Sequence, residues 1–272
     1  MLNNITLGQY YPVDSPVHRL DPRVKILLAI AMIVCVFLVG NLLGYGLILV
    51  FVLFAARLAH VPFRVLMKGL KPLRFILILT FLLNLFFTVG EPLWSLGFIH
   101  ITREGLRQSI HYSLRLIFLV VSTSLLTLTT SPIQLSDGME LLLSPLKIIH
   151  FPAHELAMMM SIALRFIPTL LEETDKIMKA QMARGADFES GNLLNRAKAM
   201  IPLLVPLFVS AFRRASDLAM AMEARCYHGG ENRTRLRVLK LKKGDLYACL
   251  LMALLIIAVI VEARLVPGGL IL

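Results

Sequence analysis

Two arginines stand out because each occupies nearly the same short motif near the end of a predicted helix. The motifs are Ala183-Arg184-Gly185 and Ala224-Arg225-Cys226. A guanidinium can form bidentate hydrogen bonds with a carboxylate, and it is favoured at the negative C-terminal end of a helix. Small neighbouring residues let a partner surface approach closely. Arginine near a helix end is common, so either motif alone would mean little, but the pair predicts two docking tips for partner proteins.

Other residues that could do chemistry are less well arranged. His150 and His154 are four residues apart and Glu155 follows, a spacing that on a continuous helix could hold a metal ion. Pro152 lies between the histidines and no further ligand is apparent, so we expect no metal site. The acidic residues of 172–175 are explained by a solvated helix face, since no nucleophile accompanies them. The chain also lacks the GxxxxGK[ST] phosphate-binding loop. We therefore expect no catalytic residue and no bound cofactor.

Two long helices must position the arginine tips. The first is predicted from about Ala153 to Ala183, and Gly185 then occupies the place of a C-cap glycine. The second is predicted from about Leu193 and is expected to end at Gly229-Gly230. Both helices begin with apolar residues, become polar and finish at an arginine.

The composition of the whole chain indicates a membrane protein. Hydrophobic residues make up 57% of it and the mean hydropathy is +0.76, above the range of soluble domains. The apolar residues gather in blocks, as membrane spans do. The sequence predicts an all-α polytopic membrane protein with about five spans, at residues 23–40, 42–59, 72–90, 111–130 and 246–261. The first two spans are long enough only if Lys25 and Arg57 extend their charged ends to the interface.

The net charge of +11 indicates orientation rather than nucleic-acid binding. The segment between the second and third spans carries five basic residues and no acidic one: Arg57, Arg64, Lys68, Lys71 and Arg74. By the positive-inside rule, this segment and the N-terminus face the cytoplasm and the C-terminus faces outward. Within the segment, residues 63–70 are amphipathic and predict a short helix on the bilayer surface.

The same orientation places residues 131–245 in the cytoplasm, between a membrane domain (1–130) and a last span with its tail (246–272). Residues 156–171 and 200–212 are apolar, and hydropathy alone favours two further spans there. However, the second stretch is short, and Arg165 would cost roughly 2.5–3.5 kcal/mol at mid-bilayer. We therefore expect both stretches to lie along or under the membrane, buried against other protein.

With this order of spans and motifs, the chain resembles the transmembrane T component of energy-coupling factor transporters, of the EcfT/CbiQ type. Residues 15–25, SPVHRLDPRVK, resemble the signature that precedes the first span of that family. The family carries two Ala-Arg-Gly-like motifs at the ends of two cytoplasmic coupling helices. Residues 183–185 match the motif fully, whereas Cys226 replaces the glycine of the second motif.

The resemblance implies a membrane scaffold of a prokaryotic importer of vitamins or metal ions. Each arginine tip would dock in a groove of one of two ABC-type ATPases, which bind the ATP and Mg. A membrane-embedded substrate-binding S component would pack against the apolar faces of the coupling helices. Its contact residues are expected to include Met158, Met159, Met160 and Leu164. Because methionine side chains adapt to different surfaces, several S components could share this contact; ordinary core filling remains the alternative.

Two other classes of protein agree less well with the sequence. A self-contained secondary transporter usually has repeated halves and ionisable groups at mid-membrane, and this sequence shows neither. A membrane-embedded enzyme would need a nucleophile and base, or metal ligands, at the bilayer edge. A scaffold that performs no catalysis itself is therefore the favoured interpretation.

Overall fold

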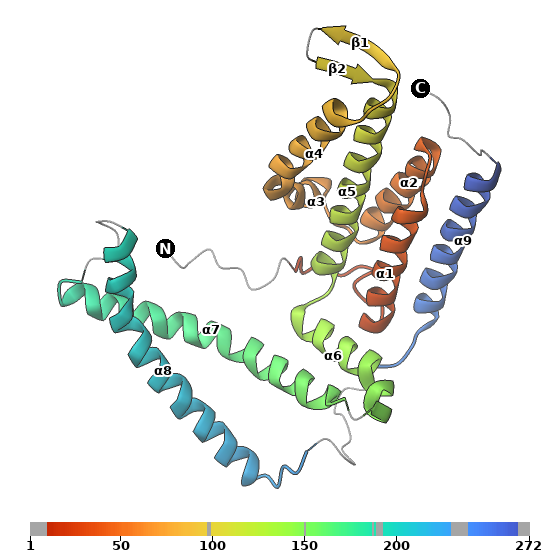
Figure 1. The fold of residues 1–272 in the computed structure, drawn as a ribbon. Helices are drawn as coiled ribbons and strands as arrows, with labels where there is room; N and C mark the ends of the chain where they lie inside the picture. Colours follow the sequence, from red (N-terminus) through yellow and green to blue (C-terminus); the bar gives the residue numbers. More distant parts are fainter. Residues whose placement is uncertain are drawn as a thin grey trace. The chain divides into compact units, whose positions relative to one another are not determined.

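The computed structural model describes residues 10–96, 99–149, 151–186, 188, 193–229 and 239–265. Most of these residues are helical, which confirms the predicted all-α fold (Figure 1). The described chain forms two compact units. Residues 10–138 and 239–265 form the first, called here the bundle unit. Residues 139–229 form the second, called the arm unit.

The bundle unit contains the apolar helices of the chain's two ends. Its elements are α1 (Pro22–Leu38), α2 (Leu42–Leu58), α3 (Phe63–Leu70), η1 (Lys71–Leu73), α4 (Arg74–Phe87), β1 (Pro92–Leu96), β2 (Ile99–Thr102), α5 (Arg103–Thr129), the first half of α6 (Pro132–Leu143) and α9 (Lys243–Leu265). Every predicted span coincides with one of the apolar helices. The predicted amphipathic helix over 63–70 is α3, and it runs through η1 into α4 without a break.

Helix length and composition identify the elements that could cross a membrane. Among the described residues, four helices are long and apolar enough: Phe63–Phe87, α5, α9 and Ala153–Ala183 of the arm unit. α2 is a shorter apolar helix. The apolar helices therefore agree with the membrane protein predicted from the sequence. Ala153–Ala183 is also long and apolar enough to cross a membrane, which is why hydropathy alone favoured a span there.

Helix α5 is the centre of the bundle unit. It packs against α1, α2, α3 and α4, while α9 packs against α1 and α2. The side chains most completely buried in this core include Cys35, Val36, Ile48, Leu66 and Val259. Large apolar side chains also cover the outside: Val50 is 67% exposed and Phe75 73%. An apolar exterior around a small core is the arrangement expected of a bundle surrounded by lipid.

The end of the bundle opposite the start of α1 differs from the sequence-based expectation. α5 begins at Arg103, before the predicted start at 111, because Thr102 caps it: its Oγ1 accepts a hydrogen bond from the Gly105 amide at 3.0 Å. The antiparallel hairpin of β1 and β2 precedes it and was not predicted. Arg115 consequently lies well inside α5, over the ring of Phe37 at 5.2 Å. The prediction followed the apolar run and missed the capped polar turns before it.

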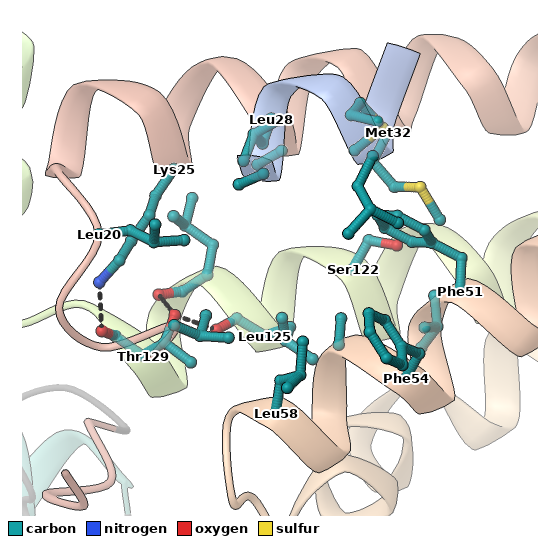
Figure 2. Close-up of a pocket in the computed structure, with 18 of the residues that line it drawn as sticks. Leu20, Lys25, Leu28, Met32, Phe51, Phe54, Leu58, Ser122, Leu125 and Thr129 are labelled. Atoms are coloured by element: carbon teal, nitrogen blue, oxygen red, sulfur yellow. Dashed lines mark hydrogen bonds between the residues drawn. The ribbon is translucent and has the colours of Figure 1, made fainter. Parts of the chain in front are cut away.

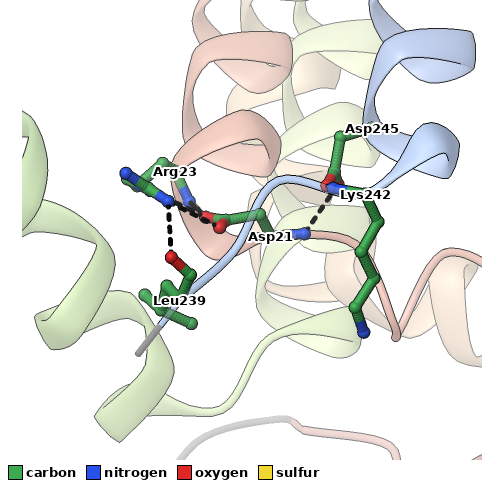
Figure 3. A network of polar contacts seen from close by, with 5 residues as sticks. All are labelled: Asp21, Arg23, Leu239, Lys242 and Asp245. Carbon is green, nitrogen blue, oxygen red and sulfur yellow. Dashed lines mark hydrogen bonds and ion pairs between the residues drawn. The ribbon is translucent and has the colours of Figure 1, made fainter. Parts of the chain in front are cut away.

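Polar groups at the start of α1 link distant parts of the chain (Figure 3). Asp21 caps α1 and pairs with Arg23 at 3.0 Å. Burial works to raise the pKa of Asp21, but hydrogen bonds from Arg23 hold it below its ordinary value. The buried Asp245 carboxylate accepts the backbone amides of Asp21 at 2.8 Å and Lys242 at 2.6 Å. The segment before α1 is thereby bonded to the start of α9.

Lys25 extends this network to α5. Its side chain is buried, and Nζ donates to the carbonyls of His18 at 3.1 Å and Thr129 at 2.9 Å. Since Thr129 is the last residue of α5, the ammonium lies at the negative end of that helix. The sequence predicted that Lys25 would reach the lipid interface; instead it faces protein carbonyls inside the bundle. We call the contacts of Asp21, Arg23, Lys25 and Asp245 the polar clasp.

The clasp predicts a large cost for removing Asp245. In Asp245→Ala, two amides inside the bundle lose their charged acceptor, and we expect the free energy of unfolding to fall by roughly 2–4 kcal/mol. Thermal unfolding of the purified protein in detergent, followed by circular dichroism, measures the change. Asp14→Ala is the matched control, because that carboxylate is exposed in an ion pair with Arg19, and its loss should leave unfolding nearly unchanged. Equal unfolding of both variants would contradict the role given to the clasp.

Candidate functional site

The arm unit carries both arginine tips. It contains the second half of α6, η2 (Ser144–Ile149), α7 (Ala153–Ala183) and α8 (Leu193–Glu223). α7 has the predicted bounds. α8 begins where predicted but ends before Gly229-Gly230, so that part of the prediction was wrong. Figure 1 shows the two helices crossing, with their C-terminal ends pointing to different sides of the crossing.

The first tip is a Schellman motif. The Gly185 amide donates to the carbonyl of Met182 at 2.9 Å, and the Ala186 amide donates to that of Gln181 at 3.0 Å. Gly185 has a φ of +88°, the left-handed conformation that this motif requires. Arg184, the C-cap residue, is exposed. The helix thus stops sharply and leaves a free guanidinium at its negative end.

The second tip has the same hydrogen-bond pattern. The Cys226 amide donates to the carbonyl of Glu223 at 2.8 Å, and the Tyr227 amide donates to that of Met222 at 3.0 Å. Arg225 therefore occupies the position that Arg184 occupies in the first tip, and it too is exposed. The resemblance seen in the sequence corresponds to one shared backbone geometry at two helix ends.

Cys226 explains why α8 ends early. Its φ is +53°, so a residue with a Cβ takes the left-handed position that glycine takes in the first tip. An L-residue is disfavoured there by roughly 1–2 kcal/mol. The substitution in the second motif therefore retains the motif's shape at some cost in local stability.

One carboxylate joins the two helices. Glu173 of α7 accepts a hydrogen bond from Ser210 at 2.5 Å and one from Arg214 at 2.9 Å, both on α8. The hydrogen bond from Ser210 and then that from Arg214 hold the pKa of Glu173 below its ordinary value. The carboxylate thus carries its charge at neutral pH. Sequence analysis had assigned Glu173 only to a solvated face; the contact between α7 and α8 gives it a structural role.

The predicted S-component residues lie on the first half of α7. Met159 is 53% exposed and Met160 47%, whereas Met158 and Leu164 are half-buried. The apolar faces of both coupling helices were expected to contact the S component, but no contact residue on α8 was named, although α8 exposes more large apolar side chains than α7. Its exposed apolar side chains recur at helical spacing and include Ile201, Leu204, Val205, Phe208 and Phe212. That periodicity was readable in the sequence and would have located them.

His154, one of the two histidines considered as metal ligands, contacts a carboxylate instead. His154 Nδ1 lies 2.9 Å from Glu140 Oε1, which ties α7 to the end of α6. Its proposed partner His150 lies outside the described residues. Within the part of the chain that the structure describes, no three metal-ligating side chains gather. The arm unit therefore offers exposed cations and apolar faces, which are features of a docking surface.

An apolar bundle combined with a pair of crossing helices that end in arginine defines a polytopic all-α membrane protein. Comparison with known proteins identifies its family. The family described as cobalt transport protein, CbiQ, matches residues 14–236. The energy-coupling factor transporter transmembrane protein EcfT of Thermosediminibacter oceani is 56% identical over 261 residues, which cover 96% of this chain and 98% of that protein. The protein of the same name from Bacillus subtilis is 55% identical over 240 residues, or 88% and 91% of the two chains.

The chain therefore belongs to the CbiQ family and is similar over nearly its whole length to transmembrane components of energy-coupling factor transporters. The protein EcfT of Clostridium kluyveri, 54% identical over 266 residues, covers 97% of this chain and 98% of its own. The match to the family confirms the resemblance seen in the sequence. It identifies a membrane transporter component.

The left-handed position at the second tip generates a stability prediction. In Cys226→Gly, relief of the unfavourable φ should stabilise the end of α8 by about 1 kcal/mol, and exchange of the Tyr227 amide should slow about fivefold. Hydrogen–deuterium exchange of the purified protein measures this. Cys226→Ala removes the thiol and keeps the Cβ, so it should not slow exchange. If alanine protects as well as glycine, backbone strain is not what weakens this helix end.

Proposed function

We propose that this chain is the transmembrane scaffold of an energy-coupling factor importer. In this role it couples ATP hydrolysis by two cytoplasmic ATPase subunits to reorientation of a substrate-binding S component that takes up a micronutrient, a vitamin or a metal ion. Membership of the CbiQ family supports the proposal. The observation that carries it is the matched pair of tips, each an exposed arginine on a Schellman motif.

Each tip is proposed to dock in a groove of one ATPase. The docking residues are Ala183, Arg184 and Gly185 on α7 and Ala224, Arg225 and Cys226 on α8. Because the last carbonyls of each helix leave a partial negative charge beside the arginine, the guanidinium is held at the end of the helix and directed outward. Acidic side chains in the groove would then receive bidentate hydrogen bonds. ATP and Mg belong to the ATPases, which supply the chemistry.

The helices α7 and α8 are proposed to transmit ATPase movement to the S component. Each is 31 residues long, and the Glu173 contacts with Ser210 and Arg214 hold them together near their crossing. A charged hydrogen-bonded contact resists sliding more than apolar packing alone. Movement of one tip would therefore move the other helix as well, instead of making one helix slide past the other.

The S component is proposed to cover the exposed apolar faces of these helices. The face of α8 that includes Phe208 and Phe212, and Met158, Met159, Met160 and Leu164 of α7, would form the contact. Polarizable, flexible methionine suits a surface that accepts several interchangeable S components. Burial of these faces against another membrane protein would also explain why α7 has the hydropathy of a span while ending in a polar, charged half.

The proposed orientation places the N-terminus and residues 131–245 in the cytoplasm and the C-terminus outside the cell membrane. The basic segment from the end of α2 to the start of α4 supports it, since it carries Arg57, Arg64, Lys68, Lys71 and Arg74. The two arginine tips would then be on the side where ATP is available.

Reversing both tip charges should separate the complex. In Arg184→Glu combined with Arg225→Glu, the tips would repel acidic groups in the grooves, and we expect ATPase co-purification to fall by at least about tenfold, with membrane insertion retained. Lys179→Glu combined with Arg213→Glu is the control, because it makes the same change in charge at exposed positions of the same helices. Retention of both ATPases by the tip variant, with normal uptake, would exclude the docking role.

The native thiol Cys226 reports the orientation of the arm unit. It is exposed in the isolated chain, so in a Cys249→Ser variant expressed without the ATPases that would cover the tip, a membrane-impermeant maleimide should label it only after cells are permeabilised. The reference is Val89→Cys combined with Cys226→Ala, since Val89 is 94% exposed at the other end of the bundle. That cysteine should be labelled in intact cells. Labelling of Cys226 from outside would reverse the proposed topology and remove the tips from any cytoplasmic ATPase.

A further inference from the structure

The bundle unit contains a cavity that the proposed coupling does not use (Figure 2). Its volume is about 360 Å³, and it is enclosed by α1, α2, α5, α9 and the segment before α1. Its floor is apolar and buried: Met32 is 4% exposed, Val52 7% and Met252 5%. The walls are nearly all aliphatic or aromatic, so the cavity suits a hydrocarbon rather than a polar solute.

The cavity opens toward the outside of the bundle. Exposed apolar side chains on two helices form its rim: Phe54 and Leu58 on α2, and Tyr247 and Leu251 on α9. Both helices are predicted spans, so this rim faces lipid. An acyl chain could therefore enter from the side.

The same two helices contact each other at their other ends. There Asn41, the residue before α2, donates to Glu262 of α9 at 3.2 Å, and a Cβ on Gly44 would lie 3.2 Å from the Glu262 carboxylate. The two helices contact each other at one end and are separated by the cavity at the other, so the opening results from the packing of the bundle itself. It does not depend on how the arm unit is placed.

The cavity has one charged end. Lys25 lines it and is 5% exposed, with its ammonium bonded to the carbonyls of His18 and Thr129. These bonds use two of the three ammonium hydrogens. Among the described residues, no carboxylate lies within ion-pair distance of Lys25. Asp245 and Asp21 stabilise the charge of Lys25 from beyond ion-pair distance. One ammonium hydrogen is therefore left for a directly bonded anion at this end of the cavity.

Further positive charge lies next to the rim. Arg57 precedes the cavity residue Leu58, Lys243 precedes Gly244, and both basic side chains are exposed. The starts of α1 and α9 and the ends of α2 and α5 all meet at this end of the cavity. An anionic headgroup at the membrane surface would therefore meet three cations while its chain lies among apolar walls.

We propose that this cavity binds an acyl chain of an anionic phospholipid, with the headgroup phosphate at the end lined by Lys25. The lipid fills the space between α2 and α9 and places its phosphate at the end of the cavity that Lys25 lines. It belongs to the leaflet that contacts the basic loop after α2. The site is separate from the arginine tips and does not rest on the importer assignment.

Native mass spectrometry of the detergent-purified protein tests the site. The probes are palmitoyl-oleoyl phosphatidylglycerol and the phosphatidylcholine with the same chains. We expect the anionic lipid to bind about fivefold or more tightly, because only its net negative charge is attracted by the basic residues. Equal binding of the two lipids to the wild-type protein would overturn the proposal.

Two substitutions distinguish this cavity from general lipid contact. Ala248→Phe fills the cavity from α9 and should remove most of the phosphatidylglycerol binding, whereas Ala253→Phe, exposed on the same helix outside the cavity, should not. Ala29→Phe blocks the cavity from α1 and gives an independent result if Ala248→Phe unfolds. Unchanged binding in a folded cavity variant would place the lipid elsewhere and contradict the site.

A third variant tests the basic residues at the charged end of the cavity. Arg57→Gln combined with Lys243→Gln changes only exposed side chains and leaves the polar clasp intact. Phosphatidylglycerol binding should fall toward the level of phosphatidylcholine, and phosphatidylcholine binding should stay the same. An equal loss for both lipids would mean that charge does not select the occupant.

Discussion

Buried charge at one end of the bundle is the constraint on which the membrane-spanning part of this protein depends. Asp245 accepts the backbone amide of Asp21, which is 224 residues away in the sequence. Lys25 donates to the last carbonyl of α5. Each of these groups would be costly to leave without a partner in an apolar bundle. The ends of α1, α5 and α9 must therefore meet, and the rest of the helix packing follows from that junction.

The two units use apolar residues differently. In the bundle unit a small core lies inside and a larger apolar surface faces outward, so helix packing depends on close contact and polar bonds rather than on exclusion of water. In the arm unit few side chains are buried, and the apolar residues of α8 are mostly exposed. Helices with so little internal core need an external surface to cover them.

The sequence predicted those features that depend on nearby residues. The apolar blocks located the helices, and Gly185 marked the end of α7 because the left-handed position favours glycine. The end of α8 was misplaced because Cys226 adopts that position without being glycine. The hairpin before α5 depends on strand pairing, and the clasp joins residues at opposite ends of the chain. Neither leaves a periodic signal in the sequence.

The candidate site was predictable to a similar extent. Both arginine motifs were recognisable as local patterns, whereas their shared Schellman geometry became visible only in three dimensions. The link through Glu173 could not be predicted, since it requires knowing which turns of α7 and α8 meet. The apolar face of α8 had a clear helical period, but the prolines and the short apolar run drew attention to membrane insertion instead.

The position of Glu173 also has a mechanical consequence. Eleven residues separate it from Arg184, and eleven separate Arg214 from Arg225. Eleven residues make about three helical turns and about 16 Å of helix on each side. The two arms that extend from this fulcrum to the arginines are thus equal in length, so a scissoring rotation about it sweeps both ends through equal arcs.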